Sequence, residues 1–357
     1  MKQKTKKIVL TGGGTAGHVM PNLALVPDLQ KEGWEILYIG SNGIEKELVQ
    51  HAKLPFYEIK SGKMRRYFSF KNFTDIFKII FGVVQAFGYL KKLRPSVVFS
   101  KGGFVAVPVA IAAKFLHIPV VSHESDITPG LANKIIARFA AKILCAFPST
   151  LRNLPLIKSE WVGTPIRKSL FSGNKHLAEK FLGVKINKKV ILVMGGSLGA
   201  QNINQLLEKT LEEITKEFFV VHITGKGKAL EIVNSQYRQF EFIGEELKDI
   251  YALADIIISR AGANSIFEFL ALKKPMILIP LEQGSRGDQI LNAAEFQKQG
   301  WAVMVREAGL TPKKLLETIA DLAAKSKSTT WRQMQFNGSD TNEKIMEILN
   351  AVYAASH

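Results

Sequence analysis

Two glycine-rich turns in the sequence have the residue types that bind phosphate groups. The first, "GGGTAGH", follows an apolar run and places Gly12, Gly14 and Gly17 at the G-x-G-x-x-G spacing of dinucleotide-binding turns. The second, "MGGSLGAQN" at residues 194–202, precedes a helix-like segment and adds a hydroxyl donor at Ser197. Backbone N–H groups at a helix N-terminus suit a diphosphate, so each turn is a candidate ligand loop. A tight turn without a ligand explains the first equally well, and chance recurrence is the alternative for the second.

The sequence around the first turn argues against a nicotinamide cofactor. NAD sites carry an acidic residue at the end of the second strand, where it binds a ribose hydroxyl. Here the second apolar run, "EILYIG", ends in Gly40 and Ser41 with no acidic residue. We therefore expect no NAD and no dehydrogenase activity.

Polar residues in the second half of the chain suit the hydroxyl groups of a sugar nucleotide. The segment "SRAGANSIFEFL" has a small-residue turn that ends in Ala263, followed by a helix that carries Glu268. A carboxylate there would accept hydrogen bonds from two ribose hydroxyls, although an exposed helix glutamate is the plainer interpretation. In "GDQILNAAEF", Gln289 and Asn292 fall on one helix face, where amides suit sugar hydroxyls or cap the helix.

Two histidines stand where a catalytic base would be expected. His18 directly follows the first glycine turn, and the positive end of a helix dipole there favours a neutral imidazole, which is able to act as a base. His123 and Glu124 end the run "VVSHE", at the carboxyl edge where parallel sheets bind ligands. A single histidine is more often structural. No cluster of His, Cys and acidic residues has metal-ligand spacing, so we predict no metal.

The elements that position these residues alternate between strand-like apolar runs and helix-length segments. Continuous apolar runs separated by helices indicate a parallel sheet covered on both faces, so the predicted fold is doubly wound α/β. The pattern restarts at "KKVILVMGGSLGAQN", which predicts two similar units with a break near "VGTPIRKS". We place the first domain at residues 1–163 and the second at residues 164–341. An amphipathic helix at about residues 342–355 then packs back onto the first domain.

Composition supports two domains and an anionic partner. At 357 residues the chain is too long for one compact core. Residues 1–160 hold 23 basic and 10 acidic residues, a net charge of +13, whereas the remainder holds 25 and 21, a net charge of +4. A basic first half suits nucleic acid, phospholipid or a phosphorylated substrate, and solubility alone is the alternative. No helix-turn-helix or RNA-binding signature is present, so we expect no nucleic-acid partner.

The segment "MRRYFSFKNFTDIFKIIFGVVQAFGYLKK", residues 64–92, carries six phenylalanines between basic residues. Its longest uncharged run has 12 residues, too short for a membrane-spanning helix, which needs about 20. Apolar residues recur at three- and four-residue steps along one helical face, namely Phe70, Phe73, Phe77, Ile80, Val84 and Phe87. This face either packs against a core or meets an anionic membrane surface, which the flanking lysines and arginines would attract.

Seven motifs in order along the chain together resemble the MurG family of peripheral membrane glycosyltransferases. They extend from residue 8 to about residue 295, and they are "GGTAGHVMPNLAL", "SKGGFVAVPVAIAA", "HESDITPGLANK", "VGTPIR", "GGSLGAQNIN", "SRAGANSIFE" and "GDQILNA". The resemblance implies a GT-B fold, in which two Rossmann-like parallel-sheet domains face each other across a cleft that holds the active site. It also implies an inverting N-acetylglucosaminyltransferase that uses no cofactor.

The implied reaction moves N-acetylglucosamine (GlcNAc) from UDP-GlcNAc to lipid I, an undecaprenyl-diphosphate-linked muramoyl-pentapeptide. The acceptor would be the C4 hydroxyl of its N-acetylmuramic acid (MurNAc) unit, and the product would be lipid II for peptidoglycan synthesis. A GT-B transferase with another lipid acceptor, such as diacylglycerol, is the alternative.

A lipid-linked acceptor favours the membrane-contact interpretation of the segment at residues 64–92. The side chains that we expect to contact an anionic membrane surface are Phe68, Phe73, Phe77 and Ile80. The protein would then be peripheral, on the cytoplasmic face of the cell membrane. A single cysteine, Cys145, fits a reducing compartment.

Family roles carry over to the matching residues of this chain. On the acceptor side, Thr15, Ala16 and Gly17 would line the site and approach the donor sugar. On the donor side, the resemblance assigns the diphosphate to Arg167 and Ser197 and the uracil to backbone atoms of Ile243. It assigns the ribose to Glu268 and the sugar to Gln289 and Asn292. Ala263 would also contact the substrate. His18 is the implied base. Asp126 stands where some members carry Asn, so the base is either His18 or Asp126.

Overall fold

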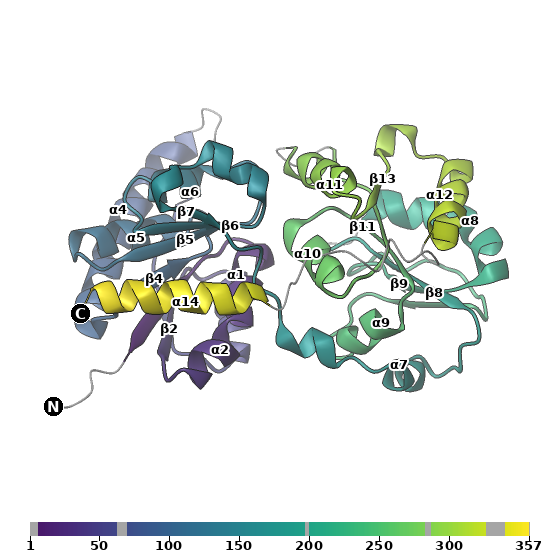
Figure 1. The fold of residues 1–357 in the computed structure, drawn as a ribbon, viewed down its shortest axis with the longest axis horizontal. Helices are drawn as coiled ribbons and strands as arrows, with labels where there is room; N and C mark the ends of the chain where they lie inside the picture. Colours follow the sequence, from purple (N-terminus) through teal and green to yellow (C-terminus); the bar gives the residue numbers. More distant parts are fainter. Residues whose placement is uncertain (1–5, 63–69, 197–199, 283–286, 326–339, 357) are drawn as a thin grey trace. The chain divides into compact units, whose positions relative to one another are not determined.

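The computed structural model describes residues 6–62, 70–196, 200–282, 287–325 and 340–356, with the backbone alone at residues 70–74 and 76. The chain forms two compact units, one of residues 1–167 with 339–357 and the other of residues 168–338. Each unit is built on one parallel sheet with helices packed against it (Figure 1). The predicted fold class, α/β with two Rossmann-like parallel sheets, is therefore confirmed.

The described sheet of the first unit has the strand order β3-β2-β1-β4-β5-β6-β7, with parallel pairings throughout. Its strands are β1 (Lys7–Thr11), β2 (Glu35–Gly40), β3 (Phe56–Glu58), β4 (Val97–Ser100), β5 (Val120–Glu124), β6 (Lys142–Cys145) and β7 (Ser159–Trp161). Its described α-helices are α1 (Ala16–Ala24), α2 (Val26–Lys31), α3 (Ile44–His51), α4 (Phe70–Leu93), α5 (Ala106–Phe115), α6 (Leu131–Ile136) and α14 (Asp340–Ala355). The strand order reverses between β1 and β4, and open parallel sheets bind ligands at such a reversal.

Alternate residues of the central strands face opposite layers of the core. Ile8 and Leu10 of β1 belong to one buried cluster, which includes Leu349 of α14, whereas Val9 belongs to a second cluster with Ala110 of α5. Because side chains alternate along a strand, a strand covered on both faces must be apolar at every position. This is why the apolar runs of the sequence are continuous.

The last helix, α14, belongs to the first unit (Figure 1, yellow). Its Leu349 lies in the same buried cluster as β1. At its start, the buried Asn342 side chain accepts a hydrogen bond from Ile166 N–H at 3.1 Å and donates to the Ile166 and Ala24 carbonyls at 3.1 and 3.3 Å. Asn342 therefore ties the end of the chain to the segment that leads into the second unit.

The second unit has the corresponding strand order, β10-β9-β8-β11-β12-β13, again with parallel pairings. Its described strands are β8 (Lys189–Met194), β9 (Phe218–Ile223), β10 (Tyr237–Phe240), β11 (Ile256–Ser259), β12 (Met276–Leu278) and β13 (Val303–Met304). Its described helices are α7 (Lys175–Leu182), α8 (Gln201–Glu217), α9 (Leu247–Leu253), α10 (Ala263–Ala271), α11 (Asp288–Lys298) and α12 (Pro312–Lys325). The strand order reverses between β8 and β11, so each unit has the sheet topology of a nucleotide-binding fold.

Candidate active site

The first glycine turn lies at the strand-order reversal of the first sheet. β1 and β4 are neighbours there, and the turns that follow them come very close. A Cβ at Gly103 would lie 2.5 Å from the Gly13 carbonyl oxygen, and Gly103 has a φ of +77°, so glycine is required at this position. The same Cβ would lie 3.4 Å from Cγ of His18. The two turns and His18 thus form one compact edge of the sheet.

A buried carboxylate binds the first glycine turn from inside the protein. Gly14 N–H donates to Oε2 of Glu45 at 3.1 Å, and Ser41 N–H donates to Oε1 at 3.1 Å. Glu45 is fully buried in the first turn of α3. The Gly14 N–H is therefore occupied by a carboxylate of the protein itself.

Thr15 and His18 form a hydrogen-bonded pair at the start of α1. Thr15 is the N-cap residue, and its Oγ1 lies 2.9 Å from Nδ1 of His18. Thr15 is exposed and His18 is half-buried, and Ala16 and Gly17 between them reach the surface as well. When the hydroxyl accepts the Nδ1 proton, Nε2 carries the lone pair of the ring, which is the form that a general base needs.

His123 belongs to a buried network and is not a surface base. Its Nε2 lies 2.7 Å from the Gly163 carbonyl oxygen, which can only accept, so this nitrogen carries the proton. Nδ1 then accepts from Lys101 Nζ at 2.6 Å, and Lys101 also donates to Ser125 Oγ at 2.8 Å. Burial and the neighbouring Lys101 hold the pKa of His123 well below its ordinary value. Burial also lowers the pKa of Lys101 to about 7, although two nearby carboxylates oppose the shift.

Glu124 shapes the turn that carries Asp126. Its Oε1 accepts from Asp126 N–H at 3.0 Å, and its Oε2 accepts from Gly130 N–H at 2.9 Å and from Asn133 Nδ2 at 2.8 Å. Glu124 is buried, whereas Asp126 is half-buried, so Asp126 is the acidic residue of this turn that reaches the surface. The two candidate bases, His18 and Asp126, therefore both lie beyond the carboxyl ends of strands in the first sheet.

A pocket of about 410 Å³ lies at the strand-order reversal of the second sheet. The ends of β8 and β11 and the N-terminal turns of α8 and α10 contribute to its lining, which consists of Gly195, Gly196, Ala200, Gln201, Asn202, Ser259, Arg260, Gly262, Ser265, Leu281 and Gln289. Two helices therefore begin at one pocket, and their N-terminal N–H groups suit a diphosphate. Ser197, the predicted hydroxyl donor, lies outside the described residues.

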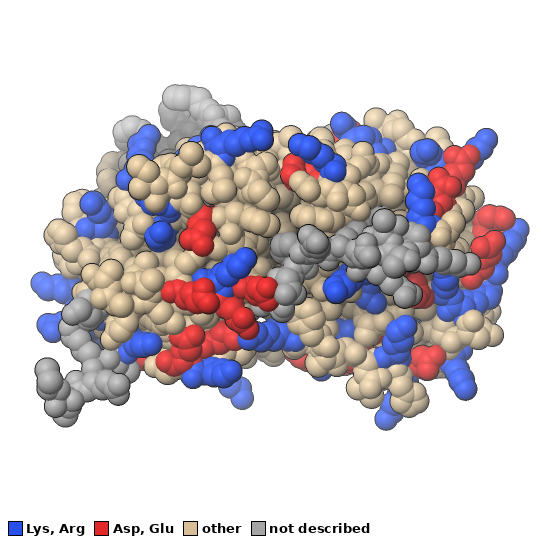
Figure 2. Space-filling model, viewed as in Figure 1, with Lys and Arg blue, Asp and Glu red and all other residues tan. Residues whose placement is uncertain are grey.

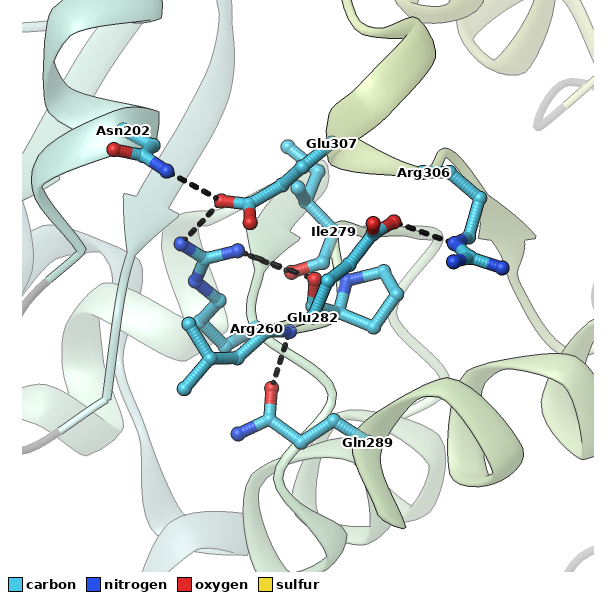
Figure 3. Close-up of polar contacts among 9 residues, drawn as sticks. Asn202, Arg260, Ile279, Glu282, Gln289, Arg306 and Glu307 are labelled. Carbon is cyan, nitrogen blue, oxygen red and sulfur yellow. Dashed lines mark hydrogen bonds and ion pairs between the residues drawn. The ribbon is translucent and has the colours of Figure 1, made fainter. Parts of the chain in front are cut away.

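An ion pair between the buried Arg260 and the half-buried Glu307 supports the loop after β12, which forms one wall of this pocket (Figure 3). Nη1 of Arg260 donates to the carbonyls of Ile279 and Pro280 at 3.1 and 3.3 Å. Nη2 pairs with Oε1 of Glu307 at 2.6 Å, and the same oxygen accepts from Asn202 Nδ2 at 3.1 Å. Arg260 is buried, and its guanidinium charge is neutralised inside the protein. We therefore interpret Arg260 as a support of the pocket wall.

Gln289 is oriented by the same loop. Its Oε1 accepts from Leu281 N–H at 3.0 Å, so its amide NH₂ is the group that it can present to a ligand (Figure 3). A ligand atom at this position must therefore be a hydrogen-bond acceptor, such as a sugar hydroxyl oxygen. Asn292, on the same helix, is fully buried and donates to the Ala261 carbonyl at 3.3 Å, which holds the turn before α10.

The other predicted donor-binding residues belong to several elements. Ala263 is the buried first residue of α10, and Glu268 is half-buried further along the same helix. Ile243 is buried in the loop after β10. Arg167 is half-buried and is the last residue of the first unit before the chain crosses to the second. The role of each of these residues stays a prediction.

Helix α4 carries an apolar face at the surface of the first unit. The exposed apolar side chains have exposed fractions between 51% and 63%, and they are Phe77, Ile80, Phe81 and Val84. Phe87, by contrast, packs with Leu90 against the core, so the predicted stripe is exposed in its middle and half-buried at its end. Phe68 and the side chain of Phe73 lie outside the described residues. Within the described part of the chain, no helix has the length and apolar character needed to cross a bilayer.

Lysines lie beside this apolar face. Nζ of Lys60 lies 5.1 Å from the centroid of the Phe81 ring, and Lys78 pairs with Asp75 at 3.1 Å. Figure 2 shows that lysine and arginine side chains are scattered over the face drawn there, whereas acidic side chains gather in a few groups. Among the residues coloured on that face, the positive charge does not gather into a single stripe.

Comparisons with known proteins agree with this architecture. The family model "Glycosyltransferase family 28 N-terminal domain" matches residues 8–145, and "Glycosyltransferase family 28 C-terminal domain" matches residues 190–347. The crystal structure of MurG from Acinetobacter baumannii is similar with a TM-score of 0.74 and 25% identity, over 97% of this chain and 99% of that one. The two sheets and their matches define a glycosyltransferase of the GT-B class.

Named relatives show which family of GT-B glycosyltransferases the chain belongs to. A UDP-N-acetylglucosamine–N-acetylmuramyl-(pentapeptide) pyrophosphoryl-undecaprenol N-acetylglucosamine transferase from Clostridium perfringens is 54% identical over 323 residues, which are 89% of this chain and 90% of that protein. A transferase of the same kind from Bacillus cereus is 47% identical over 346 residues, which are 96% of this chain and 98% of that protein. The chain therefore belongs to the MurG family of N-acetylglucosaminyltransferases.

Glu45 and Lys101, two buried charged residues beside the turns that follow the first-unit strands, were not predicted from the sequence. Lys101 follows a buried strand directly and precedes two glycines, and this position at a ligand-binding edge is a signal that identifies it. Glu45 had no such signal, because a glutamate in the first turn of a helix usually faces solvent.

Proposed function

We propose that this protein transfers GlcNAc from UDP-GlcNAc to the C4 hydroxyl of the MurNAc unit of lipid I and so makes lipid II. The observation that carries the proposal is the 54% identity, over 89% of the chain, to a transferase named for this reaction. The matching motifs occupy both sheet reversals, where parallel sheets bind ligands. We propose no nucleic-acid partner for this reaction.

The pocket of the second unit suits the diphosphate and sugar of UDP-GlcNAc. The N-terminal turns of α8 and α10 line it, and their backbone N–H groups and dipoles favour negative charge. Gln289 presents its amide NH₂, which suits a hydroxyl oxygen of the sugar. Glu268 is the residue that we assign to the ribose hydroxyls, and backbone atoms of Ile243 are assigned to the uracil. Arg167, Ser197, Ala263 and Asn292 complete the proposed donor set.

The reaction is a single displacement that inverts the anomeric carbon. The acceptor O4 attacks this carbon from the face opposite the diphosphate, and the bond from the carbon to the phosphate oxygen breaks. UDP leaves with the electron pair, while the O4 proton passes to a base. The α-linked donor thus gives a β-linked product. Helix N-termini that stabilise the growing negative charge of UDP lower the barrier, because they are already oriented before the reaction.

The first unit supplies the base. His18 and Asp126 both reach the surface beyond the carboxyl ends of the first sheet, and each has a group that can accept a proton. Thr15 supports His18 in this role, since its hydroxyl lies 2.9 Å from Nδ1 and can hold the ring with Nε2 unprotonated. We therefore place His18 first and Asp126 second. Thr15, Ala16 and Gly17 would line the acceptor beside the base.

The apolar face of α4 is proposed to hold the protein against the membrane that carries lipid I. Phe77 and Ile80 are exposed, as a membrane contact requires, and Phe68 and Phe73 belong to the same proposed surface. An apolar face with lysines beside it is attracted to an anionic lipid surface. The protein would be peripheral and would work on the cytoplasmic face of the cell membrane.

Transfer of radiolabelled GlcNAc from UDP-GlcNAc to a short-chain lipid I analogue tests this function. Diacylglycerol serves as the second acceptor, and UDP-glucose serves as the second donor. We expect label in the lipid I analogue alone and a product that is hydrolysed by a β-specific hexosaminidase. Label in diacylglycerol alone would overturn the acceptor, and equal use of UDP-glucose would overturn the donor.

A further inference from the structure

Lys101 directly follows β4, the strand that lies between β1 and β5 in the first sheet. Its backbone N–H donates to the carbonyl of Thr11, the last residue of β1, at 2.9 Å. A Cβ at Gly12 would lie 3.2 Å from Cβ of Lys101, so the first glycine turn packs closely on this residue. The main chain of Lys101 therefore belongs to the same edge of the sheet as that turn.

The side chain of Lys101 extends toward the strand on the other side, β5. Nζ donates to Nδ1 of His123, within β5, at 2.6 Å and to Oγ of Ser125 at 2.8 Å. Ser125 is the first residue after β5, and Asp126 follows it directly. Lys101 thus connects the turn that leads to His18 with the turn that carries Asp126, and these are the two candidate bases.

These contacts do not depend on the charge of Lys101. An ammonium group has three N–H donors and a neutral amine has two, so either form can supply a hydrogen to both His123 and Ser125. Nδ1 of His123 is an acceptor because the Gly163 carbonyl fixes the ring proton on Nε2. The link is therefore present above and below the pKa of Lys101, which burial lowers to about 7.

An amine is a costly group at this position. Lys101 is buried, and a polar group in the interior costs free energy unless hydrogen bonds replace those it made with water. An apolar side chain would fill the same space without this cost. The hydrogen bonds from Nζ go to the end of β5 and to the turn after it. What the amine adds beyond packing is therefore a contact that holds this turn.

We propose that Lys101 is a positioning residue for the transfer reaction, which holds the turn of Ser125 and Asp126 in a fixed position beside the first glycine turn. Glu124 accepts from two N–H groups inside the turn, those of Asp126 and Gly130. Lys101 instead reaches the turn from β4, so it sets where the turn lies relative to its neighbour. This inference rests on the proposed function and adds to it a residue that acts through the turn it holds.

The first test compares Lys101→Met with Lys114→Met, which makes the same change at an exposed position of α5. We expect Lys101→Met to lower kcat with the lipid I analogue about tenfold or more, since misplaced reacting groups slow the reaction. The Kd for UDP-GlcNAc should stay within about twofold, because the proposed donor pocket lies in the other unit. Lys114→Met should retain both values. Wild-type kcat in Lys101→Met, or an equal loss of UDP-GlcNAc binding, would overturn the positioning role.

Ser125→Ala removes the other end of the link and keeps the test valid if Lys101→Met does not fold. Ser125 is half-buried, and the change deletes only its hydroxyl. We expect kcat to fall about threefold or more, and the double variant to be no slower than Lys101→Met, because the contact is already lost there. Wild-type kcat in Ser125→Ala, or losses that multiply in the double variant, would contradict the proposal.

Amide hydrogen exchange, followed by mass spectrometry, measures the hold on the turn without turnover. We expect peptides that cover residues 126–130 to exchange about fivefold faster or more in Lys101→Met than in the wild type, and at the wild-type rate in Lys114→Met. Equal exchange in the wild type and Lys101→Met would overturn the hold on the turn. A wild-type protein that transfers no GlcNAc would instead be a failure of the proposed function, and the exchange rates would still decide whether Lys101 holds the turn.

Discussion

Nζ of Lys101 lies 2.6 Å from Nδ1 of His123 in the interior of the first unit, and neither residue is exposed to solvent. The Gly163 carbonyl fixes the proton of His123 on Nε2, so the imidazole accepts from the lysine. Lys101 also donates to Ser125, in the turn that carries Asp126. This contact therefore joins the turn after β4 to the turn that holds one of the two candidate bases.

The lowered pKa of Lys101 predicts how the stability of the protein changes with pH. The folded protein releases this proton at about pH 7, whereas the ordinary value for an unfolded lysine is 10.5. Between these values the unfolded state binds more protons, so the contribution of Lys101 to stability is lowest below about pH 7 and rises as the pH increases toward 10.5. Lys101→Met, which does not titrate, lacks this dependence.

Urea unfolding at several pH values checks this expectation. The free energy of unfolding of the wild type, relative to Lys101→Met, should rise by about 1.4 kcal/mol or less for each pH unit above neutrality. The hydrogen bonds lost in the variant add a constant to the difference and do not alter its slope. A difference that stays flat from pH 7 to pH 9 would mean that Lys101 keeps an ordinary pKa.

His18→Ala should lower kcat by about 100-fold or more if His18 is the general base. The measurement is the rate of GlcNAc transfer to a lipid I analogue under saturating conditions. Thr15→Val, which removes the hydroxyl that contacts Nδ1, should cause a smaller loss of kcat because the ring remains. Near-normal turnover in His18→Ala would assign the base to Asp126, and Asp126→Asn would then show the large loss.

Glu268→Ala should weaken the binding of UDP-GlcNAc by about 1–3 kcal/mol, because the ribose hydroxyls lose their acceptor in a half-buried site. Calorimetry with UDP-GlcNAc measures the change. Glu212→Ala on α8 is the matched control, since Glu212 is an exposed helix glutamate of the same unit. Equal affinities in the two variants would remove Glu268 from the donor site.

Replacing Phe77 and Ile80 together by serine should reduce binding to anionic lipid vesicles at least tenfold. Burial of one large apolar side chain contributes about 1.5–3 kcal/mol, so the loss of two such contacts is easily measured by vesicle sedimentation. The control variant replaces Leu156 and Ile157 by serine, because these side chains are exposed in the same unit but belong to the segment before β7 and not to α4. Vesicle binding that survives in the Phe77 and Ile80 variant, or is lost equally in the control, would refute the α4 contact.

The strands and glycine turns could be predicted from the sequence because they depend on local patterns. A strand covered on both faces is apolar at consecutive positions, as in β1 and β8, and the glycines that follow each strand mark the turn. For α4, the sequence predicted the apolar face but not which part of it is exposed. Its periodicity predicted one apolar face, but Phe77 is exposed while Phe87 packs on the core, because only the part of α4 around Ala86 and Leu90 joins the buried cluster.

The repeated α/β organisation and the order of the ligand loops follow from the sequence alone, because apolar periodicity and glycine spacing are properties of neighbouring residues. Which charged groups lie inside depends instead on how distant segments pack. Gly14 and Glu45 are 31 residues apart, and Lys101 and His123 are 22 apart, yet each pair is joined by a hydrogen bond. Parallel strands bring such distant residues to one edge of the sheet, and burial there turns ordinary surface residue types into the interior supports of the site.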